Sequence, residues 1–298
     1  MNIRKLSGLI AAPFTPLTEE GEVNYSIIPQ QVEQLIKDGV KGAYVCGSSG
    51  EGISLSLDER VKILEMWKSC SNGKLILIAH VGALSPKDIE VMARRAVELE
   101  YDAFSVIPTT FFRPATEEDL VKYCAMAAAM APELPFYYYH TMNSLVNLSM
   151  RRFLELADGR IPNLAGIKFN HHNMYEYQNC LHACGGKYDI VFGVDEFFAG
   201  ALALGAKAFI GSTYNYSAEL YQKVWQAFDA GDWQTVNEYM HKVCRGVDLL
   251  FENGGGIAAG KAMMQVKGME FGPCRLPLRQ LSHQERKNIA DAMREILN

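Results

Sequence analysis

Residues 164–169 read LAGIKF, a short and mostly apolar run that carries one lysine, Lys168. Short runs of this kind, rich in β-branched or aromatic residues, recur at fairly regular intervals as far as Thr213. Near-continuous apolar runs are typical of parallel strands that helices cover. The eight runs are LSGLIAAP (6–13), GAYVCG (42–47), LILIAHVG (75–82), AFSVIP (103–108), PFYYYH (135–140), LAGIKF (164–169), DIVFGV (189–194) and KAFIGST (207–213).

Helix-like segments separate these runs. Ser85 before Pro86 suits a helix N-cap followed by a first-turn proline. Eight strand–helix repeats predict a parallel sheet with right-handed crossovers, and eight such units close into a TIM (β/α)8 barrel. A doubly wound open sheet is the alternative.

The chain continues beyond the eighth run with helical patterns at 217–229, 233–251, 258–268 and 282–297. The first of these completes the barrel, and the others form a C-terminal helical extension. A chain of 298 residues would also fit two domains. We expect residues 1–230 to form the barrel with the active site, and residues 231–298 to form the extension of the same structural unit.

Composition and charge exclude several classes of protein. Lys plus Arg number 29 and Asp plus Glu 34, a formal charge of −5 that argues against a nucleic-acid-coating protein. The sequence has no uninterrupted apolar stretch of about 18 residues, so we expect no membrane span. The apolar run at the N-terminus is too short for a signal peptide. Seven cysteines without a Cys-x-x-Cys pair fit reduced thiols in the cytoplasm.

Strand alternation places Lys168 inside the barrel. Burial disfavours the charged form of an amine, and an amine of lowered pKa is a nucleophile toward carbonyls. A lysine at the strand mouth that reaches water is the alternative. The predicted inner face is Leu164, Gly166, Lys168 and Asn170, and the predicted outer face is Ala165, Ile167 and Phe169.

Polar residues follow several of the other strands. Tyr139 lies near the end of the fifth run, where a tyrosine could move protons to a substrate oxygen or simply pack. Ser48 and Ser49 lie in a glycine-rich loop, 47–52, that could hold a carboxylate or form an ordinary turn. Acids and hydroxyls after the seventh and eighth strands suit a polyhydroxylated ligand, although helix capping would explain them equally well.

Together these motifs resemble the N-acetylneuraminate lyase / dihydrodipicolinate synthase family. They occur in the family's order and at about its spacing, and the resemblance covers the chain from about Leu6 to the end. The tyrosine strand and the last two motifs are most similar to the sialic acid lyase branch. The motifs are Gly47-Ser48-Ser49-Gly50-Glu51, the Tyr139 strand, Gly166-Ile167-Lys168, Gly193-Val194-Asp195-Glu196 and Gly211-Ser212-Thr213-Tyr214-Asn215.

The resemblance implies a class I aldolase that needs no cofactor or metal. Lys168 would form a Schiff base with a 2-keto acid, and Tyr139 would move the proton. Sialic acid would give pyruvate and N-acetylmannosamine, and the family is usually homotetrameric. Ser48 and Ser49 would bind the carboxylate of the substrate, and its hydroxyl groups would contact Gly193, Asp195, Glu196 and Ser212. Asn170 would also bind the substrate.

The sequence departs from the family pattern in places. Residues 141–146 lack the usual proline and Thr-Gly, and Thr109-Thr110-Phe111-Phe112 lacks a tyrosine that many relatives have. Ser49 replaces the commoner threonine, and Asn170 stands where lyases often have threonine or serine. No arginine lies between His140 and Ser149, which argues against dihydrodipicolinate synthesis.

Three alternatives to a sialic acid lyase stay open. The first is a Schiff-base aldolase or dehydratase for another 2-keto sugar acid, which the altered 141–146 loop favours. The second is a non-catalytic barrel that binds a keto acid. The third is a metal-dependent hydrolase that uses His171 and His172.

Overall fold

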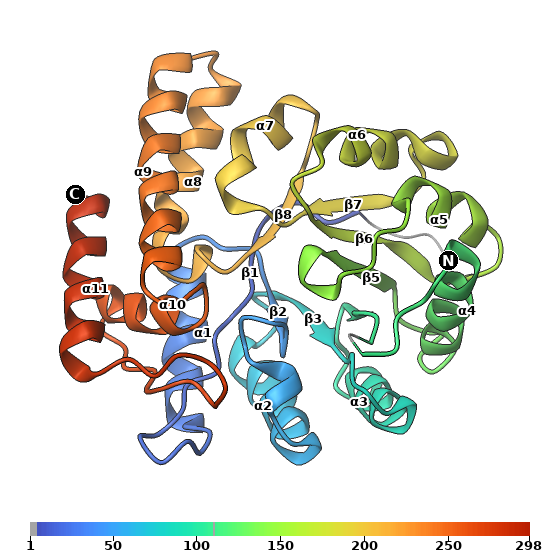
Figure 1. Ribbon diagram of the computed structural model, residues 1–298, viewed down its shortest axis with the longest axis horizontal. Coiled ribbons are helices and arrows are strands. Elements are labelled where there is room, and N and C mark those ends of the chain that lie inside the picture. The colour runs from blue at the N-terminus through green and yellow to red at the C-terminus, as the bar shows by residue number, and fades with distance from the viewer. Residues whose placement is uncertain (1–4, 110) are drawn as a thin grey trace.

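Eight parallel strands form a closed barrel at the centre of the computed structural model, which describes residues 5–109 and 111–298 (Figure 1). Each strand pairs with the next along the chain, and β8 pairs with β1. The predicted TIM barrel is therefore confirmed, and the open doubly wound sheet is wrong. The strands are β1 Gly8–Ala11, β2 Gly42–Val45, β3 Ile76–His80, β4 Ala103–Val106, β5 Phe136–Thr141, β6 Leu164–Asn170, β7 Asp189–Phe192 and β8 Ala208–Gly211.

Helices cover the outside of the barrel, and polar caps fix where several of them begin. Ser85 caps α3 by accepting a hydrogen bond from the backbone N–H of Lys87, as predicted. Ser56 and Glu59 form a reciprocal capping box at the start of α2. These helices are α1 Ile28–Lys37, α2 Leu57–Ser71, α3 Pro86–Glu98, α4 Glu117–Ala128, α5 Met150–Ala157, α6 Met174–His182, α7 Phe198–Ala203 and α8 Tyr214–Asp229.

The C-terminal extension packs on one side of the barrel, beside α8 (Figure 1). It contains α9 Trp233–Glu252, α10 Ala258–Met263 and α11 His283–Leu297. Its apolar cluster includes Phe14, which follows β1, and Tyr216 of α8, so extension and barrel share a core. The division after residue 230 stays a prediction. No helix among the described residues is long and apolar enough to cross a membrane.

Strand β6 contains an irregularity that corrects the predicted alternation. Phe136 pairs with Leu164, but the next residue, Tyr137, pairs with Gly166, so Ala165 is an extra residue. Leu164 consequently packs with the outer cluster and Ala165 with the inner one, opposite to the prediction. Beyond the bulge, Ile167 faces outward as predicted.

Gly166 is the residue that the close packing of β6 against β7 requires. A Cβ there would lie 1.7 Å from the carbonyl oxygen of Asp189 on β7, a distance that no side chain tolerates. Beyond the bulge, Lys168 points into the barrel as predicted, with its Nζ atom 4.1 Å from the centroid of the Tyr44 ring.

Candidate functional site

Lys168 and Tyr139 lie side by side inside the barrel. The two residues are paired partners on the neighbouring strands β6 and β5, which puts their side chains on the same face. The Nζ atom of Lys168 is 4.0 Å from the centroid of the Tyr139 ring. Only 4% of Lys168 and 3% of Tyr139 are exposed, so both groups are largely removed from water.

Burial lowers the pKa of the Lys168 amine below its usual value of 10.5, although Tyr139 and the Asp195 carboxylate partly offset this effect. The lysine therefore releases its proton more easily than a lysine in water. A larger share of neutral amine is what attack on a carbonyl needs.

The hydroxyl of Tyr139 is also tuned by its surroundings. Burial alone would raise the pKa of Tyr139, but the Lys168 charge and the polar side chains of Ser48, Asn170 and Thr141 outweigh it. The pKa therefore lies below 10. Asn170 Nδ2 donates to both the Tyr139 Oη and the Thr141 Oγ1 atoms at 3.4 Å. Sequence reasoning did not single out Thr141.

The loop after β2 brings Ser48 and Ser49 to the mouth of the barrel. Ser48 is exposed and Ser49 is half-buried. Gly52 is essential to the turn because a Cβ there would lie 1.9 Å from the carbonyl oxygen of Cys46. Thr15 holds the loop from the β1 side by donating to the carbonyl oxygen of Gly50 at 2.7 Å.

A buried ion pair ties this loop to the C-terminal extension. The Oε1 atom of Glu51 is 2.8 Å from the Nζ atom of Lys261 on α10, and both side chains are at most 1% exposed. The backbone N–H of Arg275 donates to the other oxygen of Glu51 at 2.7 Å. No signal in the sequence links Glu51 to Lys261, since 210 residues separate them.

Asp195 is buried at the start of the short helix η5 (Asp195–Phe197) after β7. Its Oδ2 atom accepts hydrogen bonds from the Oγ1 atom of Thr213 at 2.6 Å and from the Thr213 backbone N–H at 3.2 Å. Its Oδ1 atom is buried without a hydrogen-bond partner among the described residues. Burial raises the pKa of Asp195 to about 6. A Cβ at Gly211 would lie 1.9 Å from that Oδ1 atom, so the glycine makes room for the carboxylate.

The other predicted substrate-binding residues after β7 and β8 are more exposed to solvent than Asp195. Gly193, Glu196 and Ser212 are each half-buried. Glu196 lies 3.3 Å from His172, measured from Oε1 to Nε2. The structure thus places Asp195, Glu196 and Ser212 on adjacent strand ends, with Asp195 the most buried of the three.

The histidines do not converge on one point. His171 stacks on His140, whereas His172 stacks on Phe197 and pairs with Glu196. Across residues 5–109 and 111–298, no group of three or more His, Cys, Asp or Glu residues is arranged as a metal site.

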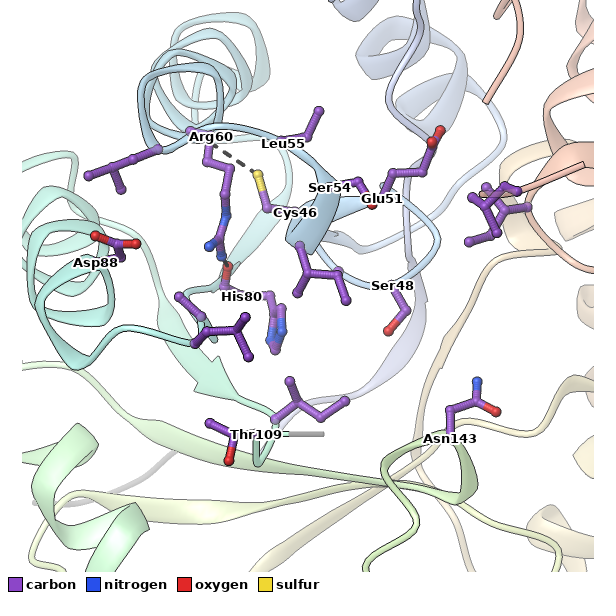
Figure 2. Close-up of a pocket in the computed structure, with 18 of the residues that line it drawn as sticks. Cys46, Ser48, Glu51, Ser54, Leu55, Arg60, His80, Asp88, Thr109 and Asn143 are labelled. Carbon is purple, nitrogen blue, oxygen red and sulfur yellow. Dashed lines mark hydrogen bonds between the residues drawn. The ribbon is translucent and has the colours of Figure 1, made fainter. Parts of the chain in front are cut away.

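A cavity of about 560 Å³ is lined by residues of the loops that follow several strands. Figure 2 shows Ser48 and His80 on one part of its wall and Asn143, from the loop after β5, on another. The candidate site is defined by the buried side chains of Lys168 and Tyr139, neither of which lines this cavity. Ser48 belongs to both regions.

The segments that depart from the family pattern lie around the barrel mouth. Phe111 and Phe112 are 80% exposed, and Leu145 is 70% exposed. Thr110 lies outside the described residues. The loop after β5 forms the short helix η3 (Met142–Ser144) and then turns at Leu145, whose φ is 54°.

Comparisons with known proteins identify the family. The model of the dihydrodipicolinate synthetase family matches residues 5–296. The chain belongs to this family. The family predicted from the sequence is confirmed, and the membership makes the chain a lyase of the aldolase kind.

Several relatives of this chain share the name N-acetylneuraminate lyase. A solved N-acetylneuraminate lyase from Aliivibrio salmonicida is 49% identical, with a TM-score of 0.97 over 99% of this chain and 98% of its own. The Proteus mirabilis N-acetylneuraminate lyase is 48% identical, with a TM-score of 0.96 over 98% and 99%. The N-acetylneuraminate lyase of Homo sapiens is 38% identical over 94% of this chain and 89% of its own.

Proposed function

We propose that this chain is a class I aldolase that cleaves N-acetylneuraminate to pyruvate and N-acetylmannosamine through a Schiff base on Lys168. The observation that carries the proposal is the buried, in-register pair of Lys168 and Tyr139. The similarity to N-acetylneuraminate lyases over nearly the whole chain supports the choice of substrate.

The reaction begins at the lysine nitrogen. Neutral Lys168 attacks the keto carbon of the open-chain sugar acid and forms a C–N bond, and loss of water from the adduct leaves a protonated imine. Tyr139 takes the proton of the C4 hydroxyl, the C3–C4 bond breaks, and its electron pair moves into the iminium to give an enamine and an aldehyde. The enamine is then protonated at C3, and water releases pyruvate from Lys168.

The two ends of the substrate meet different parts of the mouth. Ser48 and Ser49 bind the carboxylate through hydroxyl and backbone N–H groups of the loop after β2. Asn170, Gly193, Asp195, Glu196 and Ser212 contact the rest of the sugar acid. The position of Asp195 at the start of η5 supports this role, since Glu196 and Ser212 lie beside it on the adjacent ends of β7 and β8.

A second candidate is an aldolase or dehydratase for another 2-keto sugar acid. The altered loop favours it, because the short helix η3 begins directly after β5, the strand that carries Tyr139. A barrel that only binds a keto acid would keep the site without turnover.

Product detection separates these functions. We expect incubation with N-acetylneuraminate to release pyruvate and N-acetylmannosamine in equal amounts, detected by a coupled dehydrogenase and by chromatography. Release of pyruvate from other 2-keto sugar acids, and not from N-acetylneuraminate, would support the second candidate function instead. If neither N-acetylneuraminate nor any other 2-keto sugar acid tested releases pyruvate, the chain would be a barrel that only binds a keto acid. Activity that is lost with a chelator would restore the metal-dependent hydrolase.

We also propose that the chain is a cytoplasmic homotetramer. The exposed side chains of Phe111 and Phe112 support self-association, since large apolar side chains exposed next to each other are typical of protein–protein interfaces. Native mass spectrometry tests the state, and a monomer at micromolar concentration would contradict it.

A further inference from the structure

Two tyrosine rings, not one, lie against the amine of Lys168. The Nζ atom is 4.0 Å from the centroid of the Tyr139 ring and 4.1 Å from the centroid of the Tyr44 ring. The centroids of the two rings are 5.8 Å apart, and their planes are inclined by 75°. The proposed reaction gives Tyr139 a task, whereas Tyr44, which is fully buried on β2, has none so far.

The hydroxyl of Tyr44 is anchored away from the lysine. It lies 2.6 Å from the Oγ atom of Ser105 on β4 and 2.9 Å from the Nδ1 atom of His80 on β3. Burial raises the pKa of Tyr44 well above 10, so the group remains a neutral phenol. Tyr44 therefore cannot serve as the base, and what it offers Lys168 is the face of its ring.

One further positive charge lies near this ring, because the Nη2 atom of Arg60 donates to the backbone carbonyl oxygen of His80 at 2.8 Å. Burial, together with Arg60 and Lys168, holds the pKa of His80 well below 6.5, so the imidazole under Tyr44 is neutral. The groups that act on the charge of Lys168 from the other elements are Tyr139 on β5 and Asp195 at the end of β7.

We propose that Tyr44 is a further residue of the reaction, whose ring face stabilises positive charge on the Nζ atom of Lys168. The negative face of an aromatic ring attracts a cation, and the attraction strengthens where water is excluded. The inference rests on the proposed function, because it concerns the protonated imine as well as the ammonium. Both are cationic at nitrogen, whereas the enamine that follows is neutral, so the ring favours the states before C–C cleavage.

Stabilising the two cations has opposite consequences for imine formation, since the ammonium of free Lys168 opposes it and the iminium favours it. Stabilising the ammonium raises the pKa of Lys168 and so opposes burial, which lowers it. Stabilising the iminium tightens the covalent complex with pyruvate. At a pH above the pKa of Lys168 the first effect vanishes and the second remains, which makes the two separable.

A fluorination series at position 44 tests the inference without changing the shape of the ring. Tyr44→Phe is the baseline, because His80 Nδ1 and Ser105 Oγ already lie 3.0 Å apart and can bond to each other without the Tyr44 hydroxyl. Phenylalanines with one, two and three ring fluorines then weaken the negative face stepwise. The readout is pyruvate trapped on Lys168 by borohydride, measured against pyruvate concentration and pH.

We expect two graded changes along the series. The apparent pKa of imine formation falls with each fluorine, and the dissociation constant of the imine above that pKa rises by about tenfold in total. Tyr44→Leu, which removes the ring but stays apolar, gives a shift at least as large in the same directions. A flat series, or a Leu variant that matches Phe, would overturn the inference, since a ring that only fills space does not respond to fluorine.

Failure of this inference differs from failure of the proposed function. If the unaltered chain traps no pyruvate on Lys168, the Schiff-base function itself is wrong. If it traps pyruvate but the series is flat, only the role of Tyr44 is wrong. Thermal unfolding of each variant shows that the fold is kept.

Discussion

The interior around Lys168 and the rim around Glu196 are built in different ways. Lys168, Tyr139 and Tyr44 project from strands, are at most 4% exposed and touch one another. Glu196 and Ser212 lie in segments after strands and are partly open to solvent. In the proposed function, bonds are made and broken on the rigid sheet, and the substrate is selected by the loops, where sequence change costs the fold little.

The hydroxyl of Tyr139 gives the largest expected effect among the variants that keep the lysine. We expect Tyr139→Phe to lower kcat by about 10²- to 10⁴-fold, the usual contribution of a positioned proton-transfer group. The imine with pyruvate should still form, because Lys168 is untouched. Steady-state rates and borohydride trapping on the same sample check both halves. Normal turnover would remove the proton-transfer role.

The buried pair of Glu51 and Lys261 tests whether the loop after β2 depends on the extension. Lys261→Met leaves the Glu51 carboxylate buried without its partner, which we expect to cost about 3–5 kcal/mol of unfolding free energy. The dissociation constant for pyruvate should rise as well, because Ser48 and Ser49 precede Glu51. Denaturant unfolding and ligand titration measure the two effects.

A double variant is the control for this pair. Glu51→Gln combined with Lys261→Met removes both charges and keeps an acceptor for the Arg275 N–H. Its stability should lie closer to that of the unaltered chain than the single variant does. Glu51→Gln alone completes the cycle, and a loss of stability in the double variant equal to the sum of the two single losses would show that the two residues act independently.

Asp195 gives a pH dependence of stability with a definite sign. Its pKa is about 6 in the folded chain against 3.8 in the unfolded one. Stability from this group is therefore greatest below pH 4 and is lost as pH rises toward 6, by about 3 kcal/mol. Asp195→Asn should flatten this part of the profile, measured by urea unfolding between pH 4 and 7. An unchanged slope in the Asn variant would contradict the assignment.

Glu196 gives the smallest effect because it is half-buried and sits on the rim. We expect Glu196→Gln to raise KM for N-acetylneuraminate about tenfold or less, the scale of one hydrogen bond. Trapping of pyruvate alone should not change, because the proposed contact of Glu196 is to the sugar part of the substrate, which pyruvate lacks. A matching loss in pyruvate trapping would mean that the interior and the rim are not separable.

The interior was the more predictable part of the molecule. Side-chain period 2 on strands put Tyr139 and Lys168 inside, and the pairing of β5 with β6 brought them together. The bulge at Ala165 could not be predicted, because it arises in the pairing of β6 with β5. The contact of Gly166 with Asp189 likewise joins two separate strands. The Glu51–Lys261 pair and the anchoring of Tyr44 by Ser105 and His80 also depend on tertiary contacts that leave no local pattern.

The most direct test of the whole account is reduction of the chain with borohydride in the presence of pyruvate, followed by peptide mass spectrometry. We expect one reduced pyruvate adduct per chain, located on Lys168 and absent from Lys168→Ala. Lys261, a second buried lysine, serves as the internal control and should carry none. An unmodified Lys168, or an adduct spread over other lysines, would contradict the account.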